Sequence, residues 1–175
     1  MDTNNLVKWK VKWSVQKFKE DITPFRGKEE EFHKLFKPFE VIEGEGNLLL
    51  NTGKEMIWYG LQGLLVDITD YQYYDNDHAM IGVGDSSAAV VATQTKLQAA
   101  VNLAWAHMEA TYPKQSSYSW QLQASFGAGE ANFAWNEWCI CVEYLKDTGV
   151  LNRKVSSLGT KTAGTWTFTV TVTLT

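Results

Sequence analysis

In this 175-residue sequence, the residue types of Gly82–Ser87 could hold a phosphate group. Its two glycines would let backbone N–H groups approach an anion. The segment lacks the Lys-Ser/Thr pair of a Walker loop and the third glycine of a dinucleotide fingerprint, and Asp85 would repel phosphate. We therefore interpret it as a tight turn that leaves a strand, and we expect no nucleotide cofactor.

Ser86 and Ser87 would need a histidine base to act as nucleophiles. No Gly-x-Ser-x-Gly elbow surrounds them, and His33, His78 and His107 fall in unrelated segments. The sequence does not predict a Ser–His catalytic pair.

Glu130 and Glu137 are the carboxylates best placed for glycoside hydrolysis, which needs two acids flanking a sugar. Trp135 and Trp138 lie beside Glu137, but no pattern marks a cleft. In the structural alternative, Glu137 accepts hydrogen bonds from backbone N–H groups or from Arg153. We favour this alternative and predict that the protein is not an enzyme.

An acidic loop at residues 67–77 carries the oxygen ligands that Ca²⁺ prefers, without the ligand spacing or terminal Glu of an EF-hand. Calcium binding and a solvated or interface loop both stay open as interpretations. The polar loop residues are Asp67, Asp70, Asp75, Asn76 and Asp77, with Asp85 beyond the next strand.

Cys139 and Cys141 lack the second ligand pair of a zinc site. Two apart in a strand, they point to one face and fit disulfide geometry poorly, so we expect reduced, packed thiols and no cofactor.

The elements that must position these side chains are mostly strands. From Trp166 to Leu174 every even residue is apolar and every odd one is Thr, which is the period of a strand with one buried face. Further strand signals, separated by turns, lie at 78–83, 118–126, 132–144 and 150–155. They predict a mainly-β, jelly-roll-like β-sandwich with one or two short helices. Helical candidates lie at 29–36, at 52–66 after a Thr52-to-Glu55 capping box, and at 96–110.

Residues 1–45 are predicted to form an N-terminal strand and an extended charged arm, and residues 46–175 the sandwich domain. Apolar residues alternate with lysines from Val7 to Val15, which predicts a strand with one apolar and one cationic face. Such a strand can add to a sheet edge of its own domain or of a neighbour.

Candidate partner-binding residues lie in the first and last strands. The lysines would suit an acidic partner surface, or would form a solvated face, and a Thr-rich last strand at a sheet edge could pair with another chain. We expect the two N-terminal tryptophans to make intermolecular contacts. The predicted contact residues are Trp9, Trp13, Lys8, Lys10, Lys12, Thr169, Thr171 and Thr173.

Composition excludes several classes of protein. A net charge of −4 argues against direct nucleic-acid binding. No run reaches the roughly 18 apolar residues that span a bilayer, and the N-terminus lacks a signal-peptide pattern. Eight Trp, eight Phe and seven Tyr are a heavy aromatic load. Aromatic side chains fill either cores or interfaces, and we expect some of these to contact other chains.

Several segments of the chain, in their order, resemble a group of small virion structural proteins of tailed bacteriophages. Each piece is short, but the ordered set is specific and covers roughly residues 44 to 175. The resemblance implies a structural part of a phage particle, of the capsid-decoration or tail-component type. The matching segments are Gly44–Asn51, Ile81–Ser87, Thr95–Ala100, Tyr112-Pro113, Ala131–Trp138, Leu151–Val155, Leu158–Thr162 and the Thr-rich terminal run.

Within that group we expect a capsid decoration or cement protein that stabilises the head by binding capsid subunits. The alternatives are a tail, baseplate or fibre component, or a carbohydrate-binding module for host recognition. The expected partners are the major capsid protein or tail proteins of the same phage, together with further copies of the chain as a homo-oligomer. The expected location is the virion, assembled in the host bacterial cytoplasm, without direct nucleic-acid or membrane contact.

Overall fold

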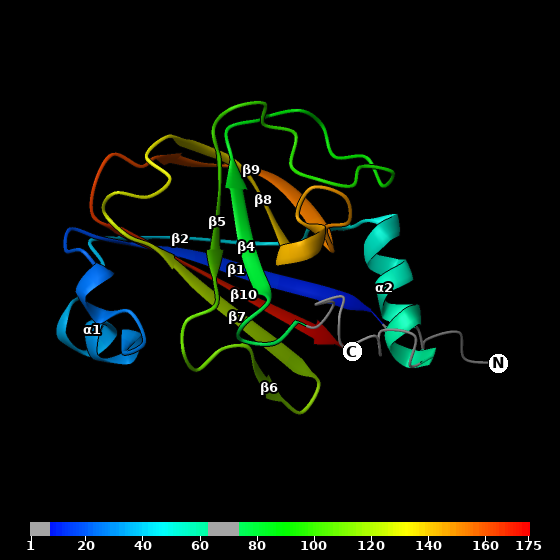
Figure 1. The fold of residues 1–175 in the computed structure, drawn as a ribbon, viewed down its shortest axis with the longest axis horizontal. Helices are drawn as coiled ribbons and strands as arrows, with labels where there is room; N and C mark the ends of the chain where they lie inside the picture. The colour runs from blue at the N-terminus through cyan, green and yellow to red at the C-terminus, as the bar shows by residue number, and fades with distance from the viewer. Residues whose placement is uncertain (1–7, 63–73) are drawn as a thin grey trace.

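The computed structural model of the chain describes residues 8–62 and 74–175. These residues form two five-stranded antiparallel sheets that pack face to face around a shared core (Figure 1). Two short α-helices lie outside the sheets. The predicted mainly-β sandwich with one or two short helices is confirmed.

The first sheet has the strand order β2-β1-β10-β7-β6. β10 is its central strand, because β1 pairs with it from Trp9 opposite Leu174 to Phe18 opposite Thr165, and β7 pairs with its other edge. The closing strand therefore has no free edge, and edge pairing through Thr169, Thr171 and Thr173 is excluded. The strands are β1 (Trp9–Phe18), β2 (Glu40–Glu45), β6 (Lys114–Ser116), β7 (Ser119–Phe126) and β10 (Thr165–Leu174).

The second sheet has the strand order β3-β9-β8-β4-β5. β8 lies at its centre with almost every residue buried, as its apolar character on both faces predicts. The strands are β3 (Leu48–Leu49), β4 (Ala79–Gly84), β5 (Leu103–His107), β8 (Ala134–Val142) and β9 (Asn152–Thr160).

The helix predicted at residues 96–110 does not form. Leu103–His107 is strand β5, which pairs with β4 from Leu103 opposite Gly84 to His107 opposite Met80. Leu97 is buried all the same, as part of the loop of residues 85–102, where it packs on Cys139 and Cys141 of the second sheet. The apolar spacing that suggested a helix face therefore comes from a loop and a strand that are buried for separate reasons.

The core between the sheets is built around aromatic side chains. Trp13 of β1 lies against Trp138 of β8 and Phe168 of β10, with ring centroids 6.2 Å apart in each case. Trp13 is only 6% exposed, so the prediction that it contacts a partner is wrong. Its position follows from strand alternation, because the odd residues of β1 and the even residues of β10 share the inward face.

Residues 19–39 form an excursion that covers one end of the outer face of the first sheet. It contains the 3-10 helix η1 (Thr23–Phe25) and α1 (Glu29–Leu35), which confirms the helix predicted at 29–36. Phe32 of α1 packs on Phe18 of β1 at 5.0 Å between centroids. The sequence assigned residues 1–45 to an N-terminal strand and arm, but β1 and β2 are strands of the sandwich. Of the described residues 8–45, the segment 19–39 is the part that leaves the sheet.

Helix α2 (Asn51–Gln62) stands at one side of the molecule in Figure 1. The predicted capping box is wrong, because the helix begins before Thr52 and the Thr52 hydroxyl donates instead to the carbonyl of Val150 at 2.8 Å. A second 3-10 helix, η2 (Glu143–Leu145), follows β8.

Replacing Trp13 with Ala should lower the free energy of unfolding by about 3–5 kcal/mol, the usual cost of truncating a buried Trp. The Tyr144→Ala control, at a residue that is 65% exposed, should change it by less than about 0.5 kcal/mol. Chemical denaturation measures both. Equal effects of the two changes would contradict the placement of Trp13 in the core.

Candidate functional site

A fully buried ion pair joins β8 to β9. Glu137 and Arg153 have no exposed side-chain area, and Arg153 Nε donates to Glu137 Oε2 at 2.5 Å. Glu137 Oε1 accepts from the backbone N–H groups of Gln98 at 2.9 Å and Ala99 at 2.7 Å. The structural interpretation of Glu137 is thus confirmed: its carboxylate is occupied by donors within the protein and presents no face to a sugar.

The same pair holds the loop of residues 85–102 against the outer face of the second sheet. Arg153 Nη2 donates to the carbonyl of Ala88 and Nη1 to Oε1 of Gln94, both at 3.0 Å. A Cβ atom at Gly84 would lie 2.7 Å from Glu137 Oε1, so the start of the loop needs glycine there. The tight turn expected at Gly82–Ser87 is wrong: Gly82, Val83 and Gly84 end strand β4, and Asp85 begins the long loop, with Gly84 making room for a carboxylate of the same chain.

Cys139 and Cys141 lie beneath this loop in an apolar cluster with Leu97 and Val150. Both are free and buried, which confirms the expected reduced thiols. Burial, together with the neighbouring Cys141, raises the pKa of the Cys139 thiol well above its usual range. Such a thiol is a packing group and not a nucleophile.

Glu130, the other carboxylate considered for sugar chemistry, belongs to a different network. It accepts from Arg26 at 2.7 Å and from the backbone N–H of Gly127 at 2.6 Å. Beside it, fully buried Lys161 donates to the carbonyl of Gly127 at 2.7 Å, and burial lowers the pKa of Lys161 to about 8. These contacts fasten the turn after β7 to the excursion.

Ser86, one of the two candidate nucleophiles, has a different hydrogen-bond partner from His78 and His107. Ser86 accepts from the backbone N–H of Ala88, and His78 contacts Asp75. His107 lies 3.9 Å from Glu143. The part of the chain that the structure describes brings no three potential metal ligands together. Asp67 and Asp70 of the predicted acidic loop lie outside the described residues.

A buried carboxylate that sequence reasoning missed lies between α1 and the first sheet. Glu109, 3% exposed, contacts His33 Nε2 at 3.0 Å and accepts from Gln123 and Ser125 at 2.6 Å. Burial acts to raise the pKa of Glu109, but the hydrogen bonds from His33 and Ser125 outweigh it and lower the pKa. The network fastens α1 to the sheet. Its members are too far apart in sequence for any spacing rule to group them.

The structure brings the predicted lysines and threonines together. On the outer face of the first sheet, beyond the part that α1 covers, Lys10 pairs with Thr173 and Lys12 with Thr171. Lys8, Lys10 and Lys12 are exposed, and Thr169, Thr171 and Thr173 are half-buried. We call these six residues, with their neighbours on β7, the Lys–Thr face.

Polar side chains of β7 extend the Lys–Thr face. Each of them bonds to a threonine of β10: Ser119 to Thr173 at 3.0 Å, Gln121 to Thr171 at 3.3 Å and Gln123 to Thr169 at 3.0 Å. These bonds hold the hydroxyl and amide groups in fixed positions along the sheet. Sequence reasoning missed the three β7 residues, although their alternation with Trp120, Leu122 and Ala124 was visible.

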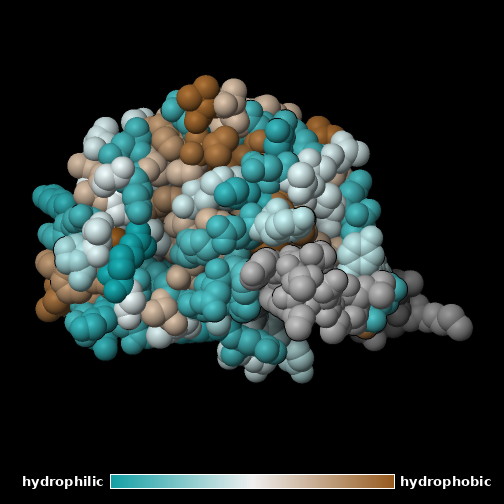
Figure 2. Space-filling model, in the orientation of Figure 1, coloured by the Kyte–Doolittle hydropathy of each residue, from teal (hydrophilic) through white to brown (hydrophobic). Residues whose placement is uncertain are grey.

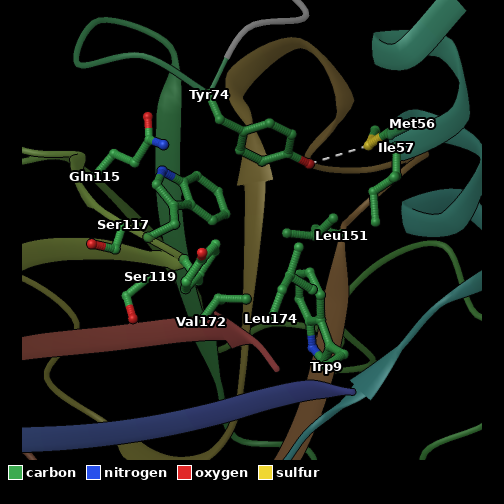
Figure 3. Close-up of a pocket in the computed structure, with 12 residues that line it drawn as sticks. Trp9, Met56, Ile57, Tyr74, Gln115, Ser117, Ser119, Leu151, Val172 and Leu174 are labelled. Atoms are coloured by element: carbon green, nitrogen blue, oxygen red, sulfur yellow. Dashed lines mark hydrogen bonds between the residues drawn. The ribbon is translucent and has the colours of Figure 1, made fainter. Parts of the chain in front are cut away.

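An apolar groove of about 470 Å³ lies at the end of the sandwich where β1 and β10 meet α2 (Figure 3). Trp9 and Leu174 point into it from the sheet, and Ile57 points into it from α2. The Tyr74 hydroxyl donates to the sulfur of Met56 at 3.1 Å, and burial raises the pKa of Tyr74 well above its usual range. The groove residues are Trp9, Met56, Ile57, Tyr74, Gln115, Ser117, Tyr118, Ser119, Trp120, Leu151, Val172 and Leu174.

Exposed apolar side chains also gather elsewhere. Figure 2 shows hydrophobic surface along the top of the molecule, where the 85–102 loop carries exposed Val91 and Val101, and near α1, where Leu35 and Phe39 are exposed. On the described part of the chain, α2 carries the densest set: Ile57, Trp58, Tyr59 and Leu61.

Comparison with known proteins found no matching family model, no matching curated protein and no matching solved structure. No helix within residues 8–62 and 74–175 has the length and apolar character needed to cross a membrane.

Removing one partner of the buried ion pair should be costly. Arg153→Met should lower the free energy of unfolding by about 3–5 kcal/mol, because it leaves the Glu137 charge buried without its cation. Hydrogen exchange should quicken first at Gln98 and Ala99, whose N–H groups bond to Glu137. The matched control is Lys12→Met, which breaks the exposed Lys12–Glu45 pair and should cost at most about 1 kcal/mol. Similar costs for both changes would contradict this account.

Glu109 should make the domain sensitive to acid. Since its folded-state pKa lies below the ordinary 4.5, its ionised form stabilises the fold above that pH, and this contribution is lost as the pH falls through the lowered value. The difference in unfolding free energy between wild type and Glu109→Gln should therefore shrink on acidification below 4.5. Glu31→Gln, at an exposed position of α1, serves as the control. A difference that is independent of pH would contradict the prediction.

Proposed function

We propose that the protein is a non-enzymatic structural component of a tailed-phage virion, and within that class a capsid decoration protein. It binds the outer surface of the head and bridges neighbouring capsid subunits. In this role added interface, and not chemistry, stabilises the head against internal pressure.

The Lys–Thr face is the observation that carries the proposal. It is an open half of a sheet whose other half is covered by α1, and its hydroxyl and amide groups are held by the bonds between β7 and β10. A shallow depression of about 430 Å³ crosses it next to Lys12 and Thr171. A rigid, exposed surface that carries Lys8, Lys10 and Lys12, with Glu43 and Glu45 of β2 beside Lys12, suits docking on a protein surface of complementary charge.

The resemblance supports the proposal through the positions of its segments. Four of the matching segments meet at Glu137 and Arg153: the end of β4 with the residues after it, the 95–100 stretch, β8 and the start of β9. These segments of the resemblance therefore share one packing requirement in this chain. We infer that these segments stabilise the second sheet and its loop, and that the Lys–Thr face on the first sheet binds the partner.

A tail, baseplate or fibre component is the main alternative, and the two are separated by where the protein binds. Labelled full-length protein is mixed with heads stripped of it and, in parallel, with isolated tails, and bound copies per particle are counted. We expect saturable binding of many copies to heads. Binding of a few copies to tails, with bare heads, would overturn the decoration role.

The double change Lys10→Glu/Lys12→Glu should weaken head binding about tenfold, or about 1.4 kcal/mol, and reduce its dependence on salt. The control is Lys34→Glu/Lys37→Glu, which makes the same change in charge at exposed positions of the excursion. Equal loss in both variants would show that overall charge, and not the Lys–Thr face, directs binding.

A carbohydrate-binding module is the second candidate function, and the apolar groove is the feature that favours it. Trp9, Tyr118 and Trp120 line the groove together with Gln115 and Ser119, and aromatic rings beside polar groups suit a sugar. Binding on a glycan array that Trp120→Ala abolishes would support the module. A blank array together with head binding would support decoration.

A further inference from the structure

Within the described residues, the close backbone contacts of helix α2 with the sandwich lie at its first turn, and further along the helix Met56 accepts a hydrogen bond from Tyr74. The N–H of Leu50 donates to the carbonyl of Leu151 at 3.1 Å, and Thr52 bonds to Val150. Gly53 approaches so closely that a Cβ there would lie 2.0 Å from the Leu151 oxygen. Gly53 is the one buried residue within Asn51–Gln62, so the rest of the helix lies on the surface of the described structure.

The exposed part of α2 carries an apolar stripe next to the apolar groove. Ile57 and Leu61 are four residues apart and therefore share a side of the helix, and Trp58 lies beside them. Ile57 also forms the helix wall of the groove. Stripe and groove are thus continuous: a ridge of large side chains stands next to a hollow lined by Trp9, Tyr118 and Leu174.

The exposed area approaches what a stable dimer needs. Trp58, Tyr59 and Tyr118 are 61%, 45% and 79% exposed. At roughly 150–250 Å² for each aromatic side chain, they present about 300–450 Å². Ile57, Leu61 and Leu174 bring the surface to about 600 Å², near the roughly 800 Å² per partner of a standard interface. The largest exposed apolar patch of a typical monomer is about 300–600 Å² and is often functional, so an area at the top of this range indicates a binding surface.

We propose that this surface binds a second copy of the chain across a twofold axis, with the α2 stripe of each copy seated in the groove of the other. A ridge and a hollow side by side on one face are what a self-complementary, isologous interface requires. The rim of α2 carries one cation and one anion, Lys54 and Glu55, so two facing copies do not meet as like-charged surfaces. The Lys–Thr face lies on the outer side of the first sheet, and it shares Ser119 with the groove, whereas its lysines and threonines lie outside the groove.

This inference does not depend on the virion proposal, since self-association can be measured on the purified chain alone. Sedimentation velocity of the full-length protein over a range of concentrations should show a monomer–dimer equilibrium. Leu61→Glu and Trp58→Ser should each raise the dissociation constant by about thirtyfold or more, as removal of an interface hot spot does.

Two control variants match these changes in residue type and exposure. Leu35→Glu alters a leucine of α1 that is 66% exposed, and Tyr144→Ser alters an aromatic residue of η2 that is 65% exposed. Both should leave the dissociation constant within about twofold of wild type, since surface changes outside an interface have small effects. Circular dichroism and thermal melts show whether each variant is folded.

A protein that stays monomeric at every concentration would overturn the proposal. A dimer that Leu61→Glu and Trp58→Ser leave intact would overturn it as well, because the contact would then lie elsewhere. Glycan binding that Trp120→Ala abolishes, in a chain that remains monomeric, would assign the groove to a sugar instead. None of these results changes the expected binding of heads through the Lys–Thr face.

Discussion

The buried pair of Glu137 and Arg153 is the interaction on which the second half of the fold depends. Moving both charges out of water costs several kcal/mol for each ion, and one ion pair seldom recovers that cost. Here the carboxylate also accepts two backbone N–H groups and the guanidinium donates to Ala88 and Gln94. The pair therefore determines where the 85–102 loop lies, and the loop in turn covers Cys139 and Cys141 on the outer face of the sheet.

The first sheet is built on a different constraint, the two-residue period of β1 and β10. Their antiparallel register places Trp13, Phe168 and Val170 inward and sets lysines against threonines on the outer face. A shift of one residue would expose the tryptophans and bury the lysines, so core packing and the Lys–Thr face are fixed by the same register. The partner surface that we propose therefore lies on the outer face of the same strands whose inner face forms the hydrophobic core.

Sequence periodicity predicted the β-sandwich and the buried even positions of β10, and turn residues around a short apolar pattern predicted α1. The structural role of Glu137 was predicted from the absence of a cleft pattern and from the nearby Arg153 segment. Sequence reasoning failed where long-range contacts decide. Trp13 looked like a contact residue, but it lies on the inward face of β1 against Trp138 of the opposite sheet. The apolar spacing of 96–110 came from a loop and a strand that are buried separately. The Glu109 network joins residues 33, 109, 123 and 125, and no local pattern links them.

The central claim is that the protein coats a phage head through the Lys–Thr face. Cryo-electron microscopy of stripped heads reconstituted with the full-length chain tests it most directly. The account predicts density for the sandwich on the capsid surface, with Lys10, Lys12 and Thr171 toward the capsid subunits. Bare heads, or a bound sandwich whose Lys–Thr face is turned to solvent, would contradict it.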